Sequence, residues 1–189
     1  DIGGGTTDIA VISLGGIVRS KNLKIAGVRF NNDIATYLRD EFKLLIGERT
    51  AENIKVAIGS VIEGEAKEVA VRGRDLVTGL PREVIVTDTD VREALAPAIV
   101  LFVDGVKEVL ETTPPEILAD VMHRGIYLTG GGALLTGLDT LLRKMLRIPV
   151  IVADDPLTAV ARGTGIILDD LDYYKEILVP TDASISPRF

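Results

Sequence analysis

The sequence predicts an α/β fold in which a smaller α+β segment, about residues 28–88, is inserted into a larger domain. Stretches with the two-residue period of strands alternate with stretches at helical spacing, in the order hairpin, helices, hairpin, helix, strand, helix. The chain has 189 residues and is 47% hydrophobic, which allows a sizeable core. We therefore expect a large subdomain of residues 1–27 and 89–175, and a loose tail at 176–189.

Composition excludes several classes of function. The formal net charge of −7 gives no overall basic surface, so we expect no nucleic-acid partner. The absence of cysteine excludes disulfides and cysteine-based zinc sites, and the single His123 cannot form a histidine cluster. The longest apolar stretch, residues 96–110, is broken by Asp104 and Lys107, and a membrane span needs about 20 apolar residues.

The first element is a predicted hairpin. Residues 8–14 and 17–25 are rich in β-branched types and flank Gly15 and Gly16, which is typical of two strands joined by a tight turn. Gly27 is expected to end the second strand.

Two helices are expected next. Apolar residues at helical spacing follow Asn31, so Asn31 or Asn32 is the expected N-cap, and Gly47 the expected end of this helix. Residues 50–58 fit a second, short helix that Thr50 caps and Gly59 ends.

The middle of the chain predicts another hairpin and then helices. Residues 68–75 and 81–88 have strand character and enclose a stretch of turn residues. A helix is expected to begin at Asp88 or Thr89, and Pro97 should break or kink it before a buried helical stretch. The sequence TTPPEI predicts a sharp stop and a new helix that begins at Pro115.

The last third of the chain is expected to alternate strand and helix. In RGIYLTGGGALLTGL, a short strand leads through three glycines into a helix that continues to residue 146. Residues 149–153 form the next predicted strand. The final stretch, residues 155–168, predicts a helix whose small residues, AVARGTG, pack closely against the sheet.

The opening stretch, DIGGGTTD, has the chemistry of a phosphate loop. Gly3, Gly4 and Gly5 let backbone N–H groups approach an anion, and Thr6 and Thr7 add hydroxyl donors. The carboxylate of Asp1 suits a hydrated magnesium ion. The glycines lead into a strand and not a helix, so neither a dinucleotide fingerprint nor a P-loop fits. An ordinary tight hairpin turn is the alternative.

Two further stretches have functional and structural interpretations. Gly130, Gly131 and Gly132 follow a strand and open a predicted helix, so they could offer free N–H groups or a flat surface for a base. The alternative is a tight strand-to-helix connection. Glu52 and Lys55 share a helix face and could bind a pair of sugar hydroxyls, although such a pair is often only a solvated surface.

Together these three stretches correspond to the parts of a nucleotide, and here the chain resembles a known family. DIGGGTTD and LTGGGALLTGL resemble the second phosphate loop and the adenosine motif of the actin-like ATPases, which have a ribonuclease H-like core. Further stretches resemble MreB, the bacterial actin family, in particular LLIGERTAENIKVAIGS, TGLPREV, TPPEILAD and DPLTAVARGTG. The resemblance extends from residue 1 to about 168.

The resemblance implies a role for each site residue. Asp1 would be the magnesium-side carboxylate, Gly3, Gly4 and Gly5 would contact the phosphates, and Thr6 would help to place the hydrolytic water, with Thr7 beside it. Glu52 and Lys55 would bind the ribose, and Gly130, Gly131 and Gly132 would pack near the adenine. The cofactors would be ATP and Mg²⁺. Residues 28–88 would be the small subdomain of the family fold.

The resemblance also implies the context of the chain. We expect it to be the second of two domains, with ATP in the cleft between them and slow ATP hydrolysis only in the full-length protein. The expected partners are other copies of the protein in head-to-tail filaments, the first domain, and cell-shape and wall-synthesis proteins. The expected location is the cytoplasm, where the filaments would associate with the membrane through the first domain only.

The residues leave three alternatives open. The same fold occurs in chaperone-type ATPases and in sugar kinases. The third alternative is an interaction module with an inert nucleotide site. It arises because AGVRFNND replaces the acidic GGDEMD-like stretch of the family near the cleft, so that Val28, Arg29 and Phe30 stand there.

Overall fold

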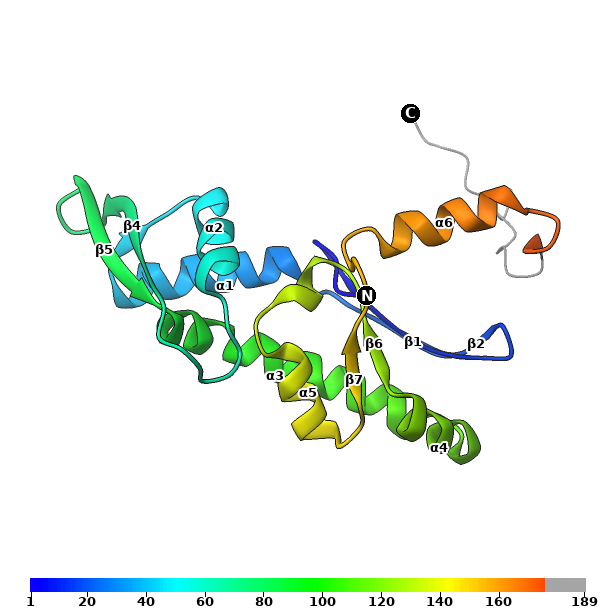
Figure 1. Ribbon diagram of the computed structural model, residues 1–189. Helices are drawn as coiled ribbons and strands as arrows, with labels where there is room; N and C mark the ends of the chain where they lie inside the picture. Colours follow the sequence, from blue (N-terminus) through cyan, green and yellow to red (C-terminus); the bar gives the residue numbers. More distant parts are fainter. Residues whose placement is uncertain (176–189) are drawn as a thin grey trace.

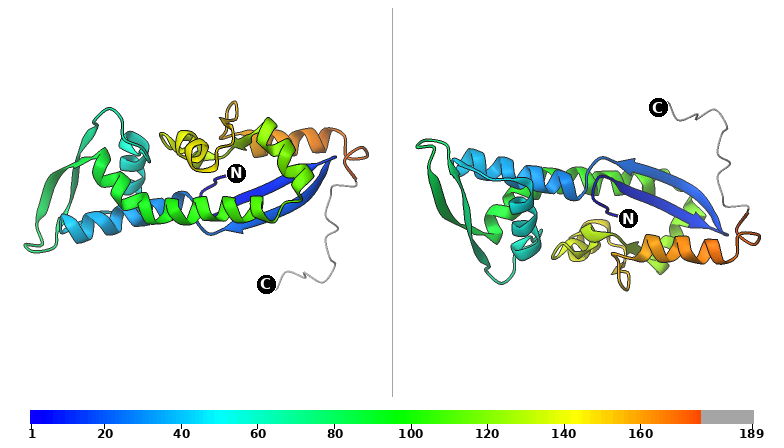
Figure 2. Two further views of the ribbon diagram at one scale, coloured as in Figure 1. Left: turned by 90° about the horizontal axis from the view of Figure 1, so that it is seen from below. Right: turned by 90° about the horizontal axis from the view of Figure 1, so that it is seen from above.

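The computed structural model describes residues 1–175, and the tail predicted at 176–189 lies outside the described residues. Strands and helices form an elongated α/β molecule (Figure 1). The β4–β5 hairpin lies at one end, and the tip of the β1–β2 hairpin lies at the other. Views from below and above show that helix α3 runs along most of the length between these ends (Figure 2).

The first predicted hairpin is confirmed. Strands β1 (Thr7–Ser13) and β2 (Gly16–Leu23) pair antiparallel, with Ser13 opposite Gly16. The two-residue turn between them consists of Leu14 and Gly15, whose φ angles are 51° and 77°. Positive φ at both turn residues matches the right-handed twist of the flanking strands, which explains why a glycine follows Leu14 here.

The helix boundaries expected near residue 31 are wrong. Helix α1 (Gly27–Glu41) begins before both expected caps, and its N-cap is Ala26, which forms no side-chain cap. Asn31 is inside the helix and buried, so neither it nor Asn32 is a cap. The helix begins early because the N–H groups of Gly27 and Val28 donate to the carbonyl oxygens of Gly3 and Gly4, a long-range contact that local propensity does not reveal.

The end predicted for the second helix is confirmed, but its predicted N-cap is wrong. Helix α2 (Glu48–Ile58) begins after Gly47, which is its N-cap and not the end of the preceding helix. Thr50 lies inside the first turn and provides no cap. The predicted end at Gly59 is confirmed, because the Gly59 N–H donates to the carbonyl oxygen of Lys55.

The second predicted hairpin is part of a three-stranded sheet. Strands β4 (Glu68–Asp75) and β5 (Pro81–Thr87) pair antiparallel, as expected. The sequence did not predict β3 (Leu44–Leu45), which pairs with the end of β4. A two-residue strand has no detectable period of its own, so only its partner strand defines it.

Helix α3 (Asp88–Glu111) is continuous through Pro97. Of the two outcomes expected at Pro97, a break or a kink, the break is therefore wrong. Pro97 is exposed, while one face of the helix buries Leu95, Phe102 and Val106 in the core. Packing of that face outweighs the hydrogen bond that proline removes. Helix α4 (Pro115–Arg124) begins at Pro115, as predicted.

The C-terminal part differs from expectation in two places. Strands β6 (Ile126–Leu128) and β7 (Val150–Val152) pair in parallel, with helix α5 (Leu138–Leu146) between them along the chain. The glycines after β6 lead only into η1 (Gly131–Leu134), a four-residue 3₁₀ helix that is separate from α5. Helix α6 (Ala159–Asp169) buries no residue, so its small residues do not pack against the sheet as expected.

The N-terminal segment lies between two small sheets, the β1–β2 hairpin and the β6–β7 pair. The Ile2 N–H donates to the carbonyl oxygen of Thr129 at 2.8 Å, just after β6. On the other side, the Asp8 N–H of β1 donates to the carbonyl oxygen of Asp1 at 2.8 Å. The first two residues therefore join the β1–β2 hairpin to the β6–β7 pair.

No helix within residues 1–175 has the length and hydropathy needed to cross a membrane.

Candidate functional site

The first glycine loop is a tight turn with two glycines at its tip. The Gly3 N–H donates to the carbonyl oxygen of Thr6 at 3.0 Å, which closes the turn around Gly4 and Gly5. A Cβ atom at Gly4 or Gly5 would meet nothing within 4 Å. Packing inside the described chain therefore does not require glycine at these two positions, whereas close approach of a ligand would.

This loop is held against the beginning of α1. The N–H groups of Gly27 and Val28 donate to the carbonyl oxygens of Gly3 and Gly4 at 3.1 and 2.8 Å. A Cβ atom at Gly27 would lie 3.4 Å from both the Gly3 oxygen and Lys55 Nζ. Gly27 thus lets the loop and two helices meet, a role that its expected position at the end of a strand did not predict.

The polar side chains of the first stretch have different surroundings. Thr7 is buried, and its hydroxyl donates to the carbonyl oxygen of Ile25 at 2.6 Å, so it fastens the hairpin beneath the loop. The Thr6 hydroxyl donates to Asp8 Oδ2 at 3.3 Å. Asp1 Oδ1 accepts from the Thr129 hydroxyl at 3.2 Å. Neither Thr6, Thr7 nor Asp1 lines the cavity described below.

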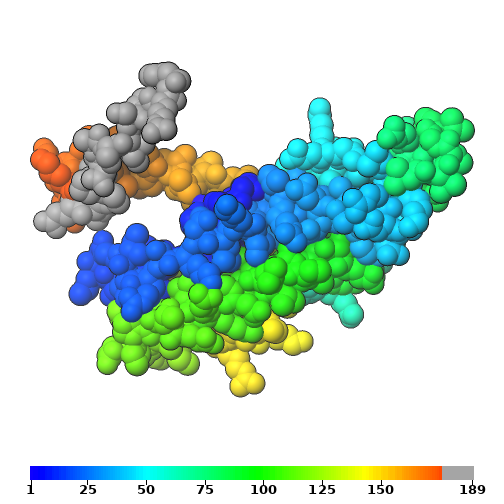
Figure 3. All heavy atoms as spheres, turned by 180° about the vertical axis from the view of Figure 1, so that it is seen from behind, coloured from blue at the N-terminus to red at the C-terminus, as the bar shows by residue number. Residues whose placement is uncertain are grey.

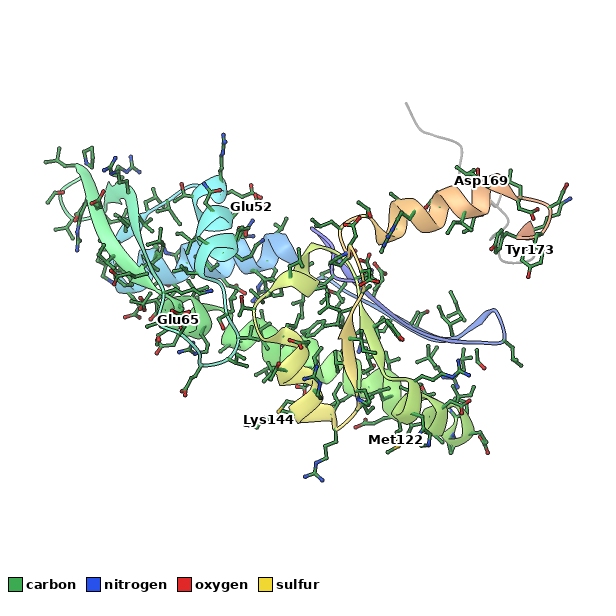
Figure 4. The ribbon with its side chains drawn as sticks, in the orientation of Figure 1. Glu52, Glu65, Met122, Lys144, Asp169 and Tyr173 are labelled. Carbon is green, nitrogen blue, oxygen red and sulfur yellow. The ribbon has the colours of Figure 1, made fainter. Side chains whose placement is uncertain are left out.

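Glu52 and Lys55 face the loop from α2. Lys55 Nζ donates to the carbonyl oxygen of Gly27 at 3.4 Å, which is a long hydrogen bond. Burial lowers the pKa of the Lys55 ammonium, and the negative charge of Glu52 opposes that shift. Glu52 is exposed and projects from α2 (Figure 4). An under-satisfied ammonium beside a free carboxylate can donate to one hydroxyl and accept from another.

Two of the three N–H groups that the second glycine triplet could offer to an anion are bonded to other parts of the chain. The Gly130 and Gly132 N–H groups donate to the carbonyl oxygens of Pro156 and Ile2, both at 2.9 Å. No α-helix begins at these glycines. A Cβ atom at Gly132 would lie 2.1 Å from Ile2 Cγ2, so packing against the N-terminal segment requires glycine there.

These elements surround one cavity of about 560 Å³. Gly3 and Gly4 lie at one wall, Glu52 and Lys55 at a second, and Gly131 and Gly132 at a third. Of the predicted site residues, Gly5 and Gly130 do not line it, in addition to the three named above. The lining also includes residues that sequence reasoning did not assign to the site: Phe30, Glu48, Val56, Gly59, Leu134, Leu135, Thr136 and Leu157.

Four residues of the cavity lining come from the unusual AGVRFNND stretch, namely Gly27, Val28, Phe30 and Asn31. All four lie in α1. Asn31 is only 4% exposed, and its Oδ1 has no hydrogen-bond partner among the described residues. The departure of this stretch from the family pattern was the sequence feature that could have identified these residues. Asn31 was instead expected to be a helix cap.

Comparisons with known proteins agree on the family. The family model described as MreB/Mbl protein matches residues 1–176. The cell shape-determining protein Mbl of Bacillus subtilis (strain 168) is 53% identical over 173 residues, which are 91% of this chain and 52% of that protein. The cell shape-determining protein MreB of Escherichia coli (strain K12) is 49% identical over 175 residues, or 92% and 50% of the two chains.

A solved structure gives the same result. The crystal structure of MreB5 of Spiroplasma citri bound to ADP matches with a TM-score of 0.88 and 41% identity, and the match covers 94% of this chain and 54% of that one. The chain thus spans about half the length of the relatives that it matches. These matches favour the bacterial-actin interpretation over the chaperone-type and sugar-kinase alternatives. The chain belongs to the MreB/Mbl family, and its fold is that of the actin-like ATPases.

Proposed function

We propose that the cavity is one side of an adenine-nucleotide site in an ATP-dependent cytoskeletal protein that governs cell shape. The observation that supports it most is the convergence of three chemically different walls, a glycine turn, a carboxylate–ammonium pair and an apolar glycine-containing wall. They match phosphate, ribose and base in turn. The ADP bound to the MreB5 relative and the cell-shape names of the Mbl and MreB relatives agree with this proposal.

The residues at the turn fit a magnesium nucleotide. Mg²⁺ keeps several waters and is usually bound through one or two carboxylates together with phosphate oxygens. The single carboxylate of Asp1 would therefore be sufficient, and it would hold the ion through one of those waters. Among residues 1–175, no group of three or more potential metal ligands occurs. A metal at this site would therefore depend on the phosphates of the nucleotide for most of its ligands.

In the full-length protein, the chain's own residues would act mainly by positioning charge. The N–H groups at Gly4 and Gly5 would donate to phosphate oxygens, where negative charge develops during phosphoryl transfer. Thr6 would orient the attacking water. Magnesium would neutralise charge on the phosphates. Because the other half of the phosphate grip would come from a first domain, we expect this chain alone to bind nucleotide but not to hydrolyse it.

Self-assembly is the second part of the proposal. Exposed apolar side chains occur at both ends of the molecule, and Figure 3 shows the two hairpins at opposite ends. Ile12, Leu14 and Ile17 lie at the β1–β2 tip, whereas Val77 and Leu80 lie at the β4–β5 turn. Different patches at opposite ends support a head-to-tail contact between copies, which generates open filaments. Filament formation beneath the membrane and contact with wall-synthesis proteins belong to the same proposal.

Nucleotide binding is tested with Gly4→Val and calorimetric titration of ADP with Mg²⁺. The new side chain occupies the open space before the turn, so we expect unchanged Tm and at least about a tenfold loss of affinity. Gly64→Val is the matched control, because a Cβ atom there also meets nothing within 4 Å and Gly64 does not line the cavity. Equal ADP affinity in both variants and the wild type would contradict the site, and no binding by the wild type would favour an inert module.

Assembly and hydrolysis are tested on the full-length protein. With ATP and Mg²⁺, we expect polymer that sediments at high speed together with slow phosphate release. Phosphate release without polymer at any salt or protein concentration would contradict the filament role while leaving the nucleotide site in place.

A further inference from the structure

Residues 59–62, called the strap here, leave the end of α2 and lie along the segment that follows η1. Ser60 and Thr136 form a parallel bridge, and the Val61 N–H donates to the carbonyl oxygen of Thr136 at 3.0 Å. The strap is thus a backbone connection between the α2 region and the region of the second glycine triplet, which are more than 70 residues apart in sequence.

Two side chains hold the strap in this conformation. The buried Ser60 hydroxyl donates to the carbonyl oxygen of Ile62 at 2.8 Å and lies 3.4 Å from the carbonyl oxygen of Thr136. Arg92 of α3 donates to the same Ile62 oxygen at 3.1 Å, and Asp88 pairs with Arg92 at 3.0 Å. The strap is therefore connected to the long central helix as well.

Gly137 is shaped to receive the strap. Its φ angle is 80°, and a Cβ atom there would lie 2.3 Å from Ile62 Cγ1. Real carbon atoms do not approach so closely, so the side chain of Ile62 can occupy its position only because residue 137 has none.

The strap lies where two walls of the cavity meet. In the chain, the strap comes after Glu52 and Lys55 of α2. The segment that pairs with it, residues 135–137, is called its partner segment here and comes after Gly131 and Gly132. Gly59, Leu135 and Thr136, which belong to the strap and its partner segment, line the cavity themselves. The contacts of the strap therefore connect the wall that contains Glu52 and Lys55 to the wall that contains Gly131 and Gly132.

We propose that the strap is a positioning element for the nucleoside part of the ligand, and that Ser60, Ile62 and Gly137 are its positioning residues. The inference rests on the proposed function. A nucleoside joins base and sugar through one bond, so the groups that receive them must keep a fixed spacing. Binding sites need their groups held to within about 0.5 Å, and the strap provides that restraint.

The test is Gly137→Ala in the full chain, measured by calorimetric titration of ADP at a temperature well below the Tm of every variant. The added methyl displaces Ile62, so we expect the ADP affinity to fall by about tenfold to a hundredfold. Adding Ile62→Ala to Gly137→Ala removes the clash, and we expect the double variant to recover most of the affinity. A purely structural role predicts instead that Gly137→Ala lowers Tm while its ADP affinity, measured below Tm, stays at the wild-type value.

Gly79→Ala is the matched control. Gly79 has a φ angle of 75°, so alanine there suffers similar backbone strain, but its Cβ atom would meet nothing within 4 Å and the residue does not line the cavity. We expect wild-type ADP affinity. If Gly137→Ala does not fold, Ser60→Ala replaces it, and a several-fold loss of ADP affinity is the expected result.

The outcomes separate the inference from the function beneath it. Wild-type ADP affinity in Gly137→Ala, or in Ser60→Ala where that variant replaces it, overturns the inference while the nucleotide site stands. Failure of Ile62→Ala to rescue Gly137→Ala also overturns it, because the loss would then have another cause. If the wild type itself binds no ADP, the proposed function fails, and the inference fails with it.

Discussion

At the scale of single residues, the glycines of this chain fall into two groups that their sequence pattern does not distinguish. Gly130 and Gly132 are required by packing, since Cβ atoms there would lie within 2.4 Å of Ile2 atoms. Gly4 and Gly5 face open space. Two similar glycine triplets therefore have different physical causes, and only the first has the properties of a loop kept free for a ligand.

Lys55 is predicted to reduce stability while serving binding. Its pKa is lowered by burial, so the unfolded chain keeps the proton to higher pH, and stability rises as pH increases from the lowered pKa towards 10.5. At pH 7 the charged amine therefore opposes folding. We expect Lys55→Met to weaken ADP binding several-fold and to have a Tm at pH 7 that is equal to or above that of the wild type. Any such increase in Tm should shrink as the pH approaches 10.5.

Lys144→Met is the control for this prediction, because Lys144 is exposed on α5 and projects away from the molecule (Figure 4). It should change neither ADP affinity nor Tm. A lower Tm for Lys55→Met at pH 7 combined with wild-type ADP affinity would show that Lys55 is a structural residue.

Asp75 is predicted to stabilise the β4–β5 turn in a pH-dependent way. The N–H of Thr78, the guanidinium of Arg82 and the N–H of Val77 lower the pKa of Asp75 to about 2. Its contribution is complete above the ordinary value of 3.8 and is lost as pH falls towards 2. We expect Asp75→Asn to lower Tm at pH 7, with the difference from the wild type narrowing in melts towards pH 3. Asp104→Asn, on an exposed part of α3, is the control and should leave Tm at pH 7 unchanged.

At the scale of elements, α3 connects the parts of the molecule. It follows directly from the small sheet at β5, lies beside α1 and β2, and ends near α4 (Figure 2). Its N-terminus has a complete capping box, in which the Asp90 N–H donates to Thr87 Oγ1 at 3.3 Å and the Thr87 N–H donates to Asp90 Oδ2 at 2.8 Å. A defined start matters here because α3 also holds the strap through Arg92.

Thr87→Ala is predicted to cost about 1 kcal/mol in the free energy of unfolding, since it removes the side-chain acceptor of the cap. Urea denaturation measures the change. Thr87→Ser keeps the hydroxyl and should remain within a few tenths of a kcal/mol of the wild type. Equal losses in the two variants would show that the threonine methyl, and not the cap, provides the stability.

At the scale of the whole molecule, the elongated shape separates two apolar hairpin ends. Leu14 is fully exposed at one of them, with a φ angle of 51° that leucine rarely adopts. A strained, solvent-exposed leucine is unfavourable for an isolated chain. A contact with another copy of the chain gives a physical reason for leucine at this position.

Leu14→Asn is predicted to weaken self-assembly without harming the fold. Asn-Gly is the preferred pair for this turn type, so Tm should stay equal or rise. The critical concentration for sedimentation of the full-length protein should increase, while ADP affinity stays unchanged. Met145→Gln, at an exposed site on α5 away from both ends, is the control and should leave assembly unchanged. An unaltered critical concentration for Leu14→Asn would remove the β1–β2 tip from the contact.

The sequence by itself determined the features that local chemistry encodes. Both hairpins followed from period-two runs and turn residues, and the start of α4 followed from Pro115. Glycine, proline and β-branched residues restrict the backbone near themselves, so such features need no information from distant residues.

Only the tertiary structure decided the rest. The start of α1 at Gly27 depends on Gly3 and Gly4, the two-residue β3 depends on β4, and the glycine at 132 depends on Ile2. The cavity and the strap arise from segments that come together only on folding. Contacts between residues far apart along the chain leave no periodic pattern in either segment, and for that reason the geometry of the site had to be read from the folded molecule.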